Sequence, residues 1–123
     1  MKKLLILALV VLAGCYYDNE EELYPDGSGC DTTNVTFSGT ILPIIEGNCF
    51  ACHGTEPGQG NIFLGDYDAI SAHGQIPPGQ PGSLYGAVSH SQDNTPMPYQ
   101  LPQLDDCQIN QIWIWISDGT PNN

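Results

Sequence analysis

The chain has 123 residues, of which 14 are acidic and two are basic, so its formal net charge at pH 7 is −12. Both basic residues, Lys2 and Lys3, lie at the very start, and residues 4–123 contain no Lys or Arg. This composition excludes binding to nucleic acid and to anionic lipid headgroups through a polybasic patch, because both need clustered cationic side chains.

The first 14 residues are typical of the signal peptide of an exported lipoprotein. Lys2 and Lys3 form a basic n-region, and residues 4–12 form an apolar stretch that is too short to span a membrane. Residues 12–15, Leu-Ala-Gly-Cys, resemble the lipobox of bacterial lipoproteins, which implies cleavage before Cys15 and a lipid anchor on its sulfur. The alternative is an ordinary signal peptide followed by a chance Cys. We expect an exported bacterial lipoprotein, on the periplasmic side of the membrane or on the cell surface.

Residues 15–34 are predicted to form an acidic, flexible tether. They are rich in Asp, Glu and Gly and lack any apolar periodicity, so they offer no face that could be buried in a core. The domain itself is expected to occupy residues 35–123, which leaves room for one small domain.

A short helix is predicted at the start of this domain. Apolar residues cluster at positions 41–45, and Thr40 is the expected N-cap, with Pro43 in the first turn where its missing N–H costs nothing. Gly47 and Asn48 are then expected to turn the chain.

Three further helices are predicted. Asp66 is expected to cap a helix that closes at Gly74, and a short helix is expected at about residues 83–89. Asp105 and Gln108 resemble a capping box at the start of the last helix. Helical spacing predicts one apolar face for this helix, and Gly119 is expected at its C′ position. The residues of that face are Ile109, Ile112, Trp113 and Ile116.

Residues 49–53, Cys-Phe-Ala-Cys-His, carry the strongest functional signal. A Cys-x-x-Cys-His pentad is the attachment signature of c-type haem. Two thiols three residues apart can add to the two vinyl groups of one porphyrin, and the adjacent imidazole then lies beneath the iron. The pattern predicts one covalent haem c on Cys49 and Cys52, with His53 as an iron ligand. The alternative is a zinc site of four thiolates that also uses Cys30 and Cys107, but it lacks a second Cys-x-x-Cys pair.

Met97 is the predicted second iron ligand. It is the only Met after Met1, and prolines on both sides hold it in an extended loop. His90 and His73 are the alternatives, and either would lower the reduction potential relative to a Met ligand.

The remaining cysteines predict a disulfide. Of five Cys in the chain, Cys15 is assigned to the lipid and two to the haem, which leaves Cys30 and Cys107. Such a pair in an exported protein reads as a disulfide bond, and two free thiols are the alternative.

Taken together, residues 35–121 resemble a class I cytochrome c. The pentad follows a first helix, Met97 lies in a Pro-flanked loop, and an amphipathic helix comes last. The short separation of His53 and Met97 resembles bacterial members, and the Cys-bearing last helix resembles small cytochrome lipoproteins of Bacteroidetes-like bacteria. The resemblance implies an all-α fold whose first and last helices pack together around the haem.

The resemblance also implies electron transfer between exported redox proteins rather than an enzymatic reaction. The alternatives are a haem-based sensor or binder of small ligands, and a fixed electron-relay subunit of a larger respiratory or surface complex. The Lys ring with which many cytochromes c dock to acidic partners is absent. We therefore expect a redox partner with a basic docking face.

Overall fold

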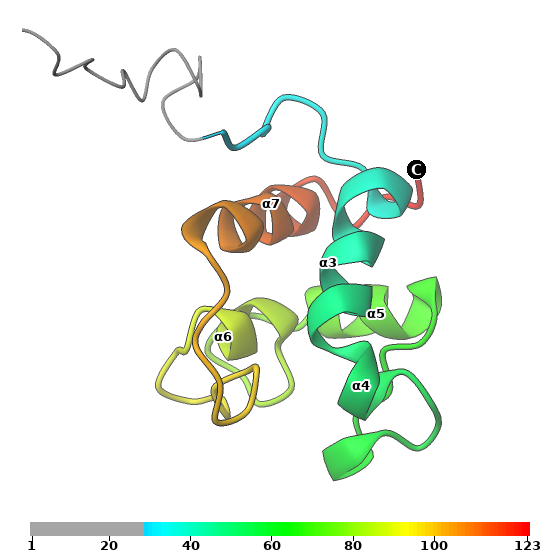
Figure 1. The fold of residues 1–123 in the computed structure, drawn as a ribbon, viewed down its shortest axis with the longest axis vertical. Coiled ribbons are helices and arrows are strands. Elements are labelled where there is room, and N and C mark those ends of the chain that lie inside the picture. Colours follow the sequence, from blue (N-terminus) through cyan, green and yellow to red (C-terminus); the bar gives the residue numbers. More distant parts are fainter. Residues whose placement is uncertain (1–28) are drawn as a thin grey trace, which may run out of the picture. The chain divides into compact units, whose positions relative to one another are not determined.

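The computed structural model describes residues 29–123, and every regular element in this range is helical. No strand occurs among the described residues, which confirms the predicted all-α class. The chain divides into two units, Met1–Cys30 and Asp31–Asn123, and the described helices belong to the second (Figure 1). The predicted signal peptide, the lipidation site Cys15 and the tether up to residue 28 lie outside the described residues.

The first helical segment begins at Thr36. Its Oγ1 accepts a hydrogen bond from the Gly39 N–H at 3.1 Å, which caps the wide helical turn η2 (Phe37–Ile41). The helix α3 (Leu42–Asn48) follows without a break. The predicted cap at Thr40 is wrong, because the cap lies four residues earlier and the Thr40 Oγ1 instead accepts a bond from the Thr36 N–H at 3.4 Å.

The helix α4 (Phe50–His53) continues from α3 after a kink at Cys49, where φ is −122° and ψ is −32°. The predicted turn at Gly47 and Asn48 is wrong, since both residues lie within α3. The Cys49 N–H donates to the Ile45 carbonyl at 2.8 Å, so helical hydrogen bonding runs through this segment. As a result, the pentad is a direct extension of the first helix rather than a separate loop.

The two middle helices, α5 (Tyr67–Gly74) and α6 (Leu84–Val88), were both expected from the sequence. The Asp66 carboxylate caps α5 and the Ser83 hydroxyl caps α6, each by accepting the N–H three residues later, at 2.8 and 3.0 Å. Between the pentad and α5 the chain makes the short turn η3 (Gln59–Asn61).

Gly74 ends α5 as predicted, but packing explains why a glycine is needed there. A Cβ at Gly74 would lie 3.1 Å from both the Thr120 and the Trp115 side chains. The missing side chain therefore lets the end of α5 approach the C-terminal segment closely.

The last helix, α7 (Asp106–Ser117), begins and ends as predicted. The Asp105 carboxylate accepts a hydrogen bond from the Gln108 N–H at 2.8 Å. Beyond the helix, Gly119 has φ of 85°, a left-handed conformation that favours glycine.

The predicted apolar face of α7 is wrong for one residue. Trp113 is 43% exposed, with its ring against Tyr85 at a centroid distance of 4.7 Å, whereas Trp115 is fully buried. The Trp115 indole N–H donates to the Pro121 carbonyl at 2.9 Å, and its ring lies 5.7 Å from that of Phe37. These distant partners fix the rotation of α7 about its axis.

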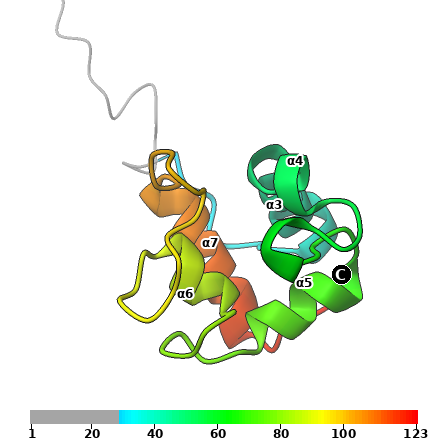
Figure 2. The same cartoon turned by 90° about the horizontal axis from the view of Figure 1, so that it is seen from below.

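The core of the unit Asp31–Asn123 lies between η2, α3 and α5–α7, and α7 packs against both η2 and α6. Figures 1 and 2 show α4 and the loop after α6 on opposite sides, both at the end of the unit away from α7. None of the helices in the described part of the chain has the length and apolar character that a membrane span requires. The buried apolar residues are Phe37, Ile41, Ile44, Ile45, Leu64, Ile70, Leu84, Val88, Leu104, Ile112 and Trp115.

Candidate functional site

The pentad residues Cys49, Cys52 and His53 lie on one helical turn. The Cys52 and His53 N–H groups both donate to the Cys49 carbonyl, at 3.1 and 2.9 Å. Both thiols are free, with Cys52 exposed and Cys49 half-buried. The structure therefore brings together two thiols and an imidazole, which a haem attachment site requires.

His53 is 9% exposed, and its ring is oriented by one hydrogen bond. Its Nδ1 lies 2.8 Å from the carbonyl oxygen of Ile62. Because a carbonyl can only accept, Nδ1 must carry the proton, and in a neutral imidazole the lone pair then lies on Nε2. Metal-binding histidines commonly hold the other ring N–H in this way.

The second ring nitrogen of His53 is available to a ligand. Nε2 has no hydrogen-bond partner among the described residues. No side-chain N or O atom in residues 29–123 is both fully buried and unpaired, so Nε2 is not completely enclosed. A nitrogen with a free lone pair therefore lies on the residue that directly follows the two thiols of the pentad.

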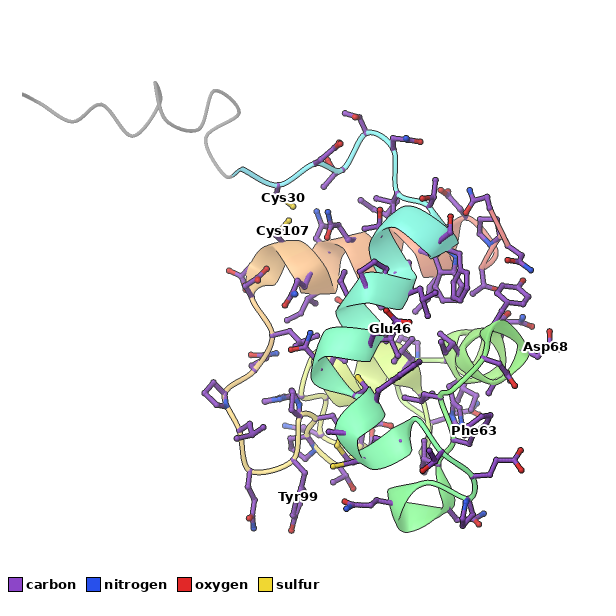
Figure 3. The ribbon with its side chains drawn as sticks, turned by 45° about the vertical axis from the view of Figure 1, so that its right-hand side comes forward. Cys30, Glu46, Phe63, Asp68, Tyr99 and Cys107 are labelled. Carbon is purple, nitrogen blue, oxygen red and sulfur yellow. The ribbon has the colours of Figure 1, made fainter. Side chains whose placement is uncertain are left out.

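A return segment, residues 54–65, holds His53 through its backbone as well. The Leu64 N–H donates to the His53 carbonyl at 2.8 Å, while the Ile62 carbonyl accepts from the ring. Phe63, labelled in Figure 3, marks this segment between the two bonds. No residue pattern in the sequence pointed to Ile62, because any residue can supply a backbone carbonyl.

The electrostatics of Cys49 argue against thiol–disulfide exchange as the chemistry of the pentad. Burial, with a smaller contribution from the neighbouring Cys52, raises the pKa of the Cys49 thiol from 9.0 to about 11. Redox-active Cys-x-x-Cys pairs instead need a thiol whose pKa is lowered, since the thiolate is the nucleophile. Near neutral pH, Cys49 is a protonated thiol.

Met97 lies on the loop after α6 and is fastened to that helix rather than to α4. Its N–H donates to the Ala87 carbonyl at 3.0 Å, and its carbonyl lies 3.0 Å from His90 Nε2. Since the carbonyl accepts, His90 Nε2 is the donor in this bond. The Met97 side chain is half-buried, and its sulfur makes no hydrogen bond with any described residue.

Each of the two alternative histidines has a ring nitrogen within hydrogen-bond distance of a backbone carbonyl. His90 Nε2 holds the Met97 carbonyl, and His73 Nδ1 lies 2.8 Å from the Gly82 carbonyl. Both rings are less buried than that of His53. His90, which the sequence presented as a rival ligand, thus acts as a support for the Met97 backbone.

The loop that carries Met97 is tied down at further points. The Asn94 side-chain amide and the Ser91 hydroxyl both donate to the Pro78 carbonyl, at 2.9 and 3.1 Å. The Gln103 amide donates to the Val88 carbonyl at 3.0 Å. These contacts join segments 13–16 residues apart, and no local sequence pattern marks any of the three side chains.

Cys30 and Cys107 form a disulfide, which confirms the pairing predicted from the sequence (Figure 3). Two of the four thiolates that a zinc site would need are therefore used. Within residues 29–123, no group of three or more His, Cys, Asp or Glu side chains could hold a metal ion. The zinc alternative does not fit this arrangement, whereas a haem brings its own four nitrogen ligands and needs only axial ones.

Comparison with protein-family models, with curated proteins and with solved structures found no match to this chain.

Proposed function

We propose that this chain is a lipid-anchored monohaem c-type cytochrome that transfers electrons between exported redox proteins. The observation that carries the proposal is the state of His53. Its Nδ1–H donates to the Ile62 carbonyl at 2.8 Å, which leaves the Nε2 lone pair free on the residue immediately after a Cys-x-x-Cys pair. Sequence motif and ring orientation are independent, and both point to the same chemistry.

Each site residue has a distinct role in this proposal. Cys49 and Cys52 would carry the thioether bonds, His53 would supply one iron ligand through Nε2, and Met97 would supply a second through its sulfur. When bound, the haem iron would supply a one-electron redox couple. The chain itself has to hold two ligands in place in both oxidation states, and the backbone contacts of His53 and Met97 suit that task.

Three observations favour Met97 over His90 as the second ligand. The Met97 backbone is fixed on both sides, by the Ala87 carbonyl and by His90 Nε2, so its side chain leaves from a well-defined position. His90 already uses Nε2 to hold that backbone. A lone thioether in a Pro-flanked polar loop also has no need to fill a core.

The Met97→Ala variant, with His90→Ala as its comparison, tests the ligand assignment. Met97→Ala should keep the haem, lose the long-wavelength band of the ferric spectrum, lower the reduction potential and bind carbon monoxide when reduced. His90→Ala should keep the band, although the less well-held loop should make it easier to lose on heating. If only His90→Ala removes the band, Met97 is not the ligand.

Any haem propionates in this chain would have to rely on neutral donors, because residues 4–123 contain no Lys or Arg. Three side chains make no hydrogen bond with any described residue and could serve: Trp113, Tyr85 and Asn61. Three others already donate inside the unit: Trp115, Tyr67 and Gln75.

The redox partner should present a basic surface with some apolar area. The chain is strongly acidic, and the loop of Met97 exposes Tyr99 at 63% and Leu101 at 65%. Figure 3 labels Tyr99 on this loop. Association with such a partner should weaken steeply as salt rises, because screening acts on exposed charges. A salt-independent association rate would argue for an uncharged partner surface.

Mass spectrometry of the exported full chain tests the proposal as a whole. One haem should be attached, and it should survive acid–acetone extraction, because thioether bonds are covalent. Cys49→Ser together with Cys52→Ser should abolish this attachment. The mass of the bare chain, or bound zinc, would overturn the proposal.

A further inference from the structure

Gly58 lies against the carbonyl group that orients His53. A Cβ placed on Gly58 would lie 1.8 Å from the Ile62 oxygen and 2.6 Å from the Ile62 carbonyl carbon. That oxygen is the atom that accepts the His53 Nδ1–H at 2.8 Å. The space that a side chain at position 58 would need is thus filled by the Ile62 carbonyl oxygen, which orients the His53 imidazole.

Neither partner in this contact is free to retreat. The Gly58 N–H donates to the Thr55 carbonyl at 2.7 Å, and the Gly58 carbonyl accepts from the Asn61 N–H at 3.2 Å. On the other side, Leu64 is held by its bond to the His53 carbonyl at 2.8 Å. A Cβ would have to separate position 58 from the Ile62 oxygen by at least about 1 Å, and a hydrogen bond does not survive a displacement of that size at constant geometry.

We propose that Gly58 is a positioning residue for His53. By leaving room for the Ile62 carbonyl, it holds the imidazole in the Nδ1–H form and keeps Nε2 as the ligand nitrogen. The inference rests on the proposed function in one respect only, the identity of the group that binds His53 Nε2. The proton position and the orientation of the ring are properties of the chain itself.

Gly60 provides a matched control in the same segment. Gly58 and Gly60 both have positive φ, 72° and 64°, so an Ala at either position carries the strain of a left-handed backbone. A Cβ at Gly60, however, meets nothing within 4 Å. A comparison of Gly58→Ala with Gly60→Ala therefore distinguishes the effect of displacing the Ile62 carbonyl from the effect of backbone strain.

The experiment measures hydrogen exchange of the His53 Nδ1–H by NMR in the exported full chain, reduced if haem is attached. The wild-type proton should exchange slowly, and Gly60→Ala should leave its rate within about twofold, while Gly58→Ala should accelerate exchange roughly tenfold through loss of one hydrogen bond. The indole N–H of buried Trp115 is the internal reference and should keep its rate. In a haem-bearing protein, the reduction potential should also shift in Gly58→Ala and not in Gly60→Ala.

Four outcomes would overturn the inference: an unchanged Nδ1–H rate in Gly58→Ala, an equal acceleration in Gly60→Ala, an equal acceleration at Trp115, or, in the wild type, a proton that exchanges at the solvent rate. The last measurement tests the His53–Ile62 bond even if Gly58→Ala does not fold, because a wild-type proton that exchanges at the solvent rate leaves Gly58 nothing to position. Mass spectrometry of the same sample reports haem attachment separately. A chain without haem whose His53 Nδ1–H is protected would overturn the proposed function and leave the role of Gly58 standing.

Discussion

Replacing Trp115 with Phe should destabilise the unit Asp31–Asn123 far more than replacing Trp113 with Phe. The two residues are identical and lie two positions apart in α7, so helix propensity and chemistry are matched. Their surroundings differ, because Trp115 is fully buried and Trp113 is 43% exposed. The comparison tests the rotation of α7, on which the contacts of α7 with η2 and α6 depend.

The expected magnitude follows from two losses at Trp115. Its indole N–H donates to the Pro121 carbonyl at 2.9 Å, and leaving that carbonyl unpaired costs about 1–3 kcal/mol. The smaller ring also leaves a void beside Phe37, which adds about 1 kcal/mol. The free energy of unfolding should therefore fall by about 2–4 kcal/mol. The Trp113 indole N–H makes no hydrogen bond with a described residue, so Trp113→Phe should cost less than about 1 kcal/mol.

Urea unfolding of both variants and the wild type, followed by far-UV circular dichroism, measures this difference. The midpoint should fall clearly for Trp115→Phe with an unchanged slope, and thermal melting should show a gap of about 10 °C between the two variants. An equal or larger loss in Trp113→Phe would mean that α7 is rotated relative to the structure described above.

Three further predictions concern stability and thiol chemistry. The double variant Cys30→Ser and Cys107→Ser should lose at most about 4 kcal/mol, because the disulfide closes a loop of about 77 residues, and its visible spectrum should not change; equal melting temperatures would contradict this. Gly47→Ala should raise the free energy of unfolding by about 0.5–1 kcal/mol, and Gly74→Ala should lower it by about 1–3 kcal/mol. The reason is that a Cβ at Gly74 meets neighbouring side chains, whereas a Cβ at Gly47 meets nothing within 4 Å. Urea midpoints that shift in the same direction for both variants would contradict this prediction. In the chain without haem, the pKa of Cys49 is raised from 9.0 to about 11, so the contribution of this thiol to stability is present below pH 9 and is lost towards pH 11. Cys49 should also react with iodoacetamide more slowly at pH 8 than cysteine in an unstructured peptide. An equal rate would contradict the burial of Cys49.

The helix ends were predictable where the signal is local. A carboxylate at Asp66 or Asp105 can reach the N–H three residues later without help from the rest of the fold, and both do. The left-handed Gly119 depends equally on its own backbone. Such features need only a few neighbouring residues, so they can be identified in the sequence.

The errors arose where distant residues decide the outcome. Helical spacing placed Trp113 on the apolar face of α7, but it does not fix which of several overlapping faces turns inward. Phe37, whose ring packs near that of Trp115, comes from η2, and the Pro121 carbonyl that accepts the indole N–H lies beyond the end of α7. Likewise, Thr40 has the right chemistry for a cap, but the helix already begins at Thr36.

The candidate site shows the same division in chemical terms. The pentad predicts His53 as an iron ligand by residue type and spacing, but three histidines in this chain each have a ring nitrogen within hydrogen-bond distance of a backbone carbonyl. Which nitrogen is left free depends on which carbonyl lies within reach, and every residue has a carbonyl. His53 and His90 differ for this reason, since one keeps Nε2 and the other uses it to hold Met97. His73 also keeps Nε2, so a free nitrogen alone does not define a ligand, and the proposed assignment to His53 needs the two thiols of the pentad as well. In the inference drawn above, the missing side chain of Gly58 keeps the Ile62 carbonyl in place beside that imidazole.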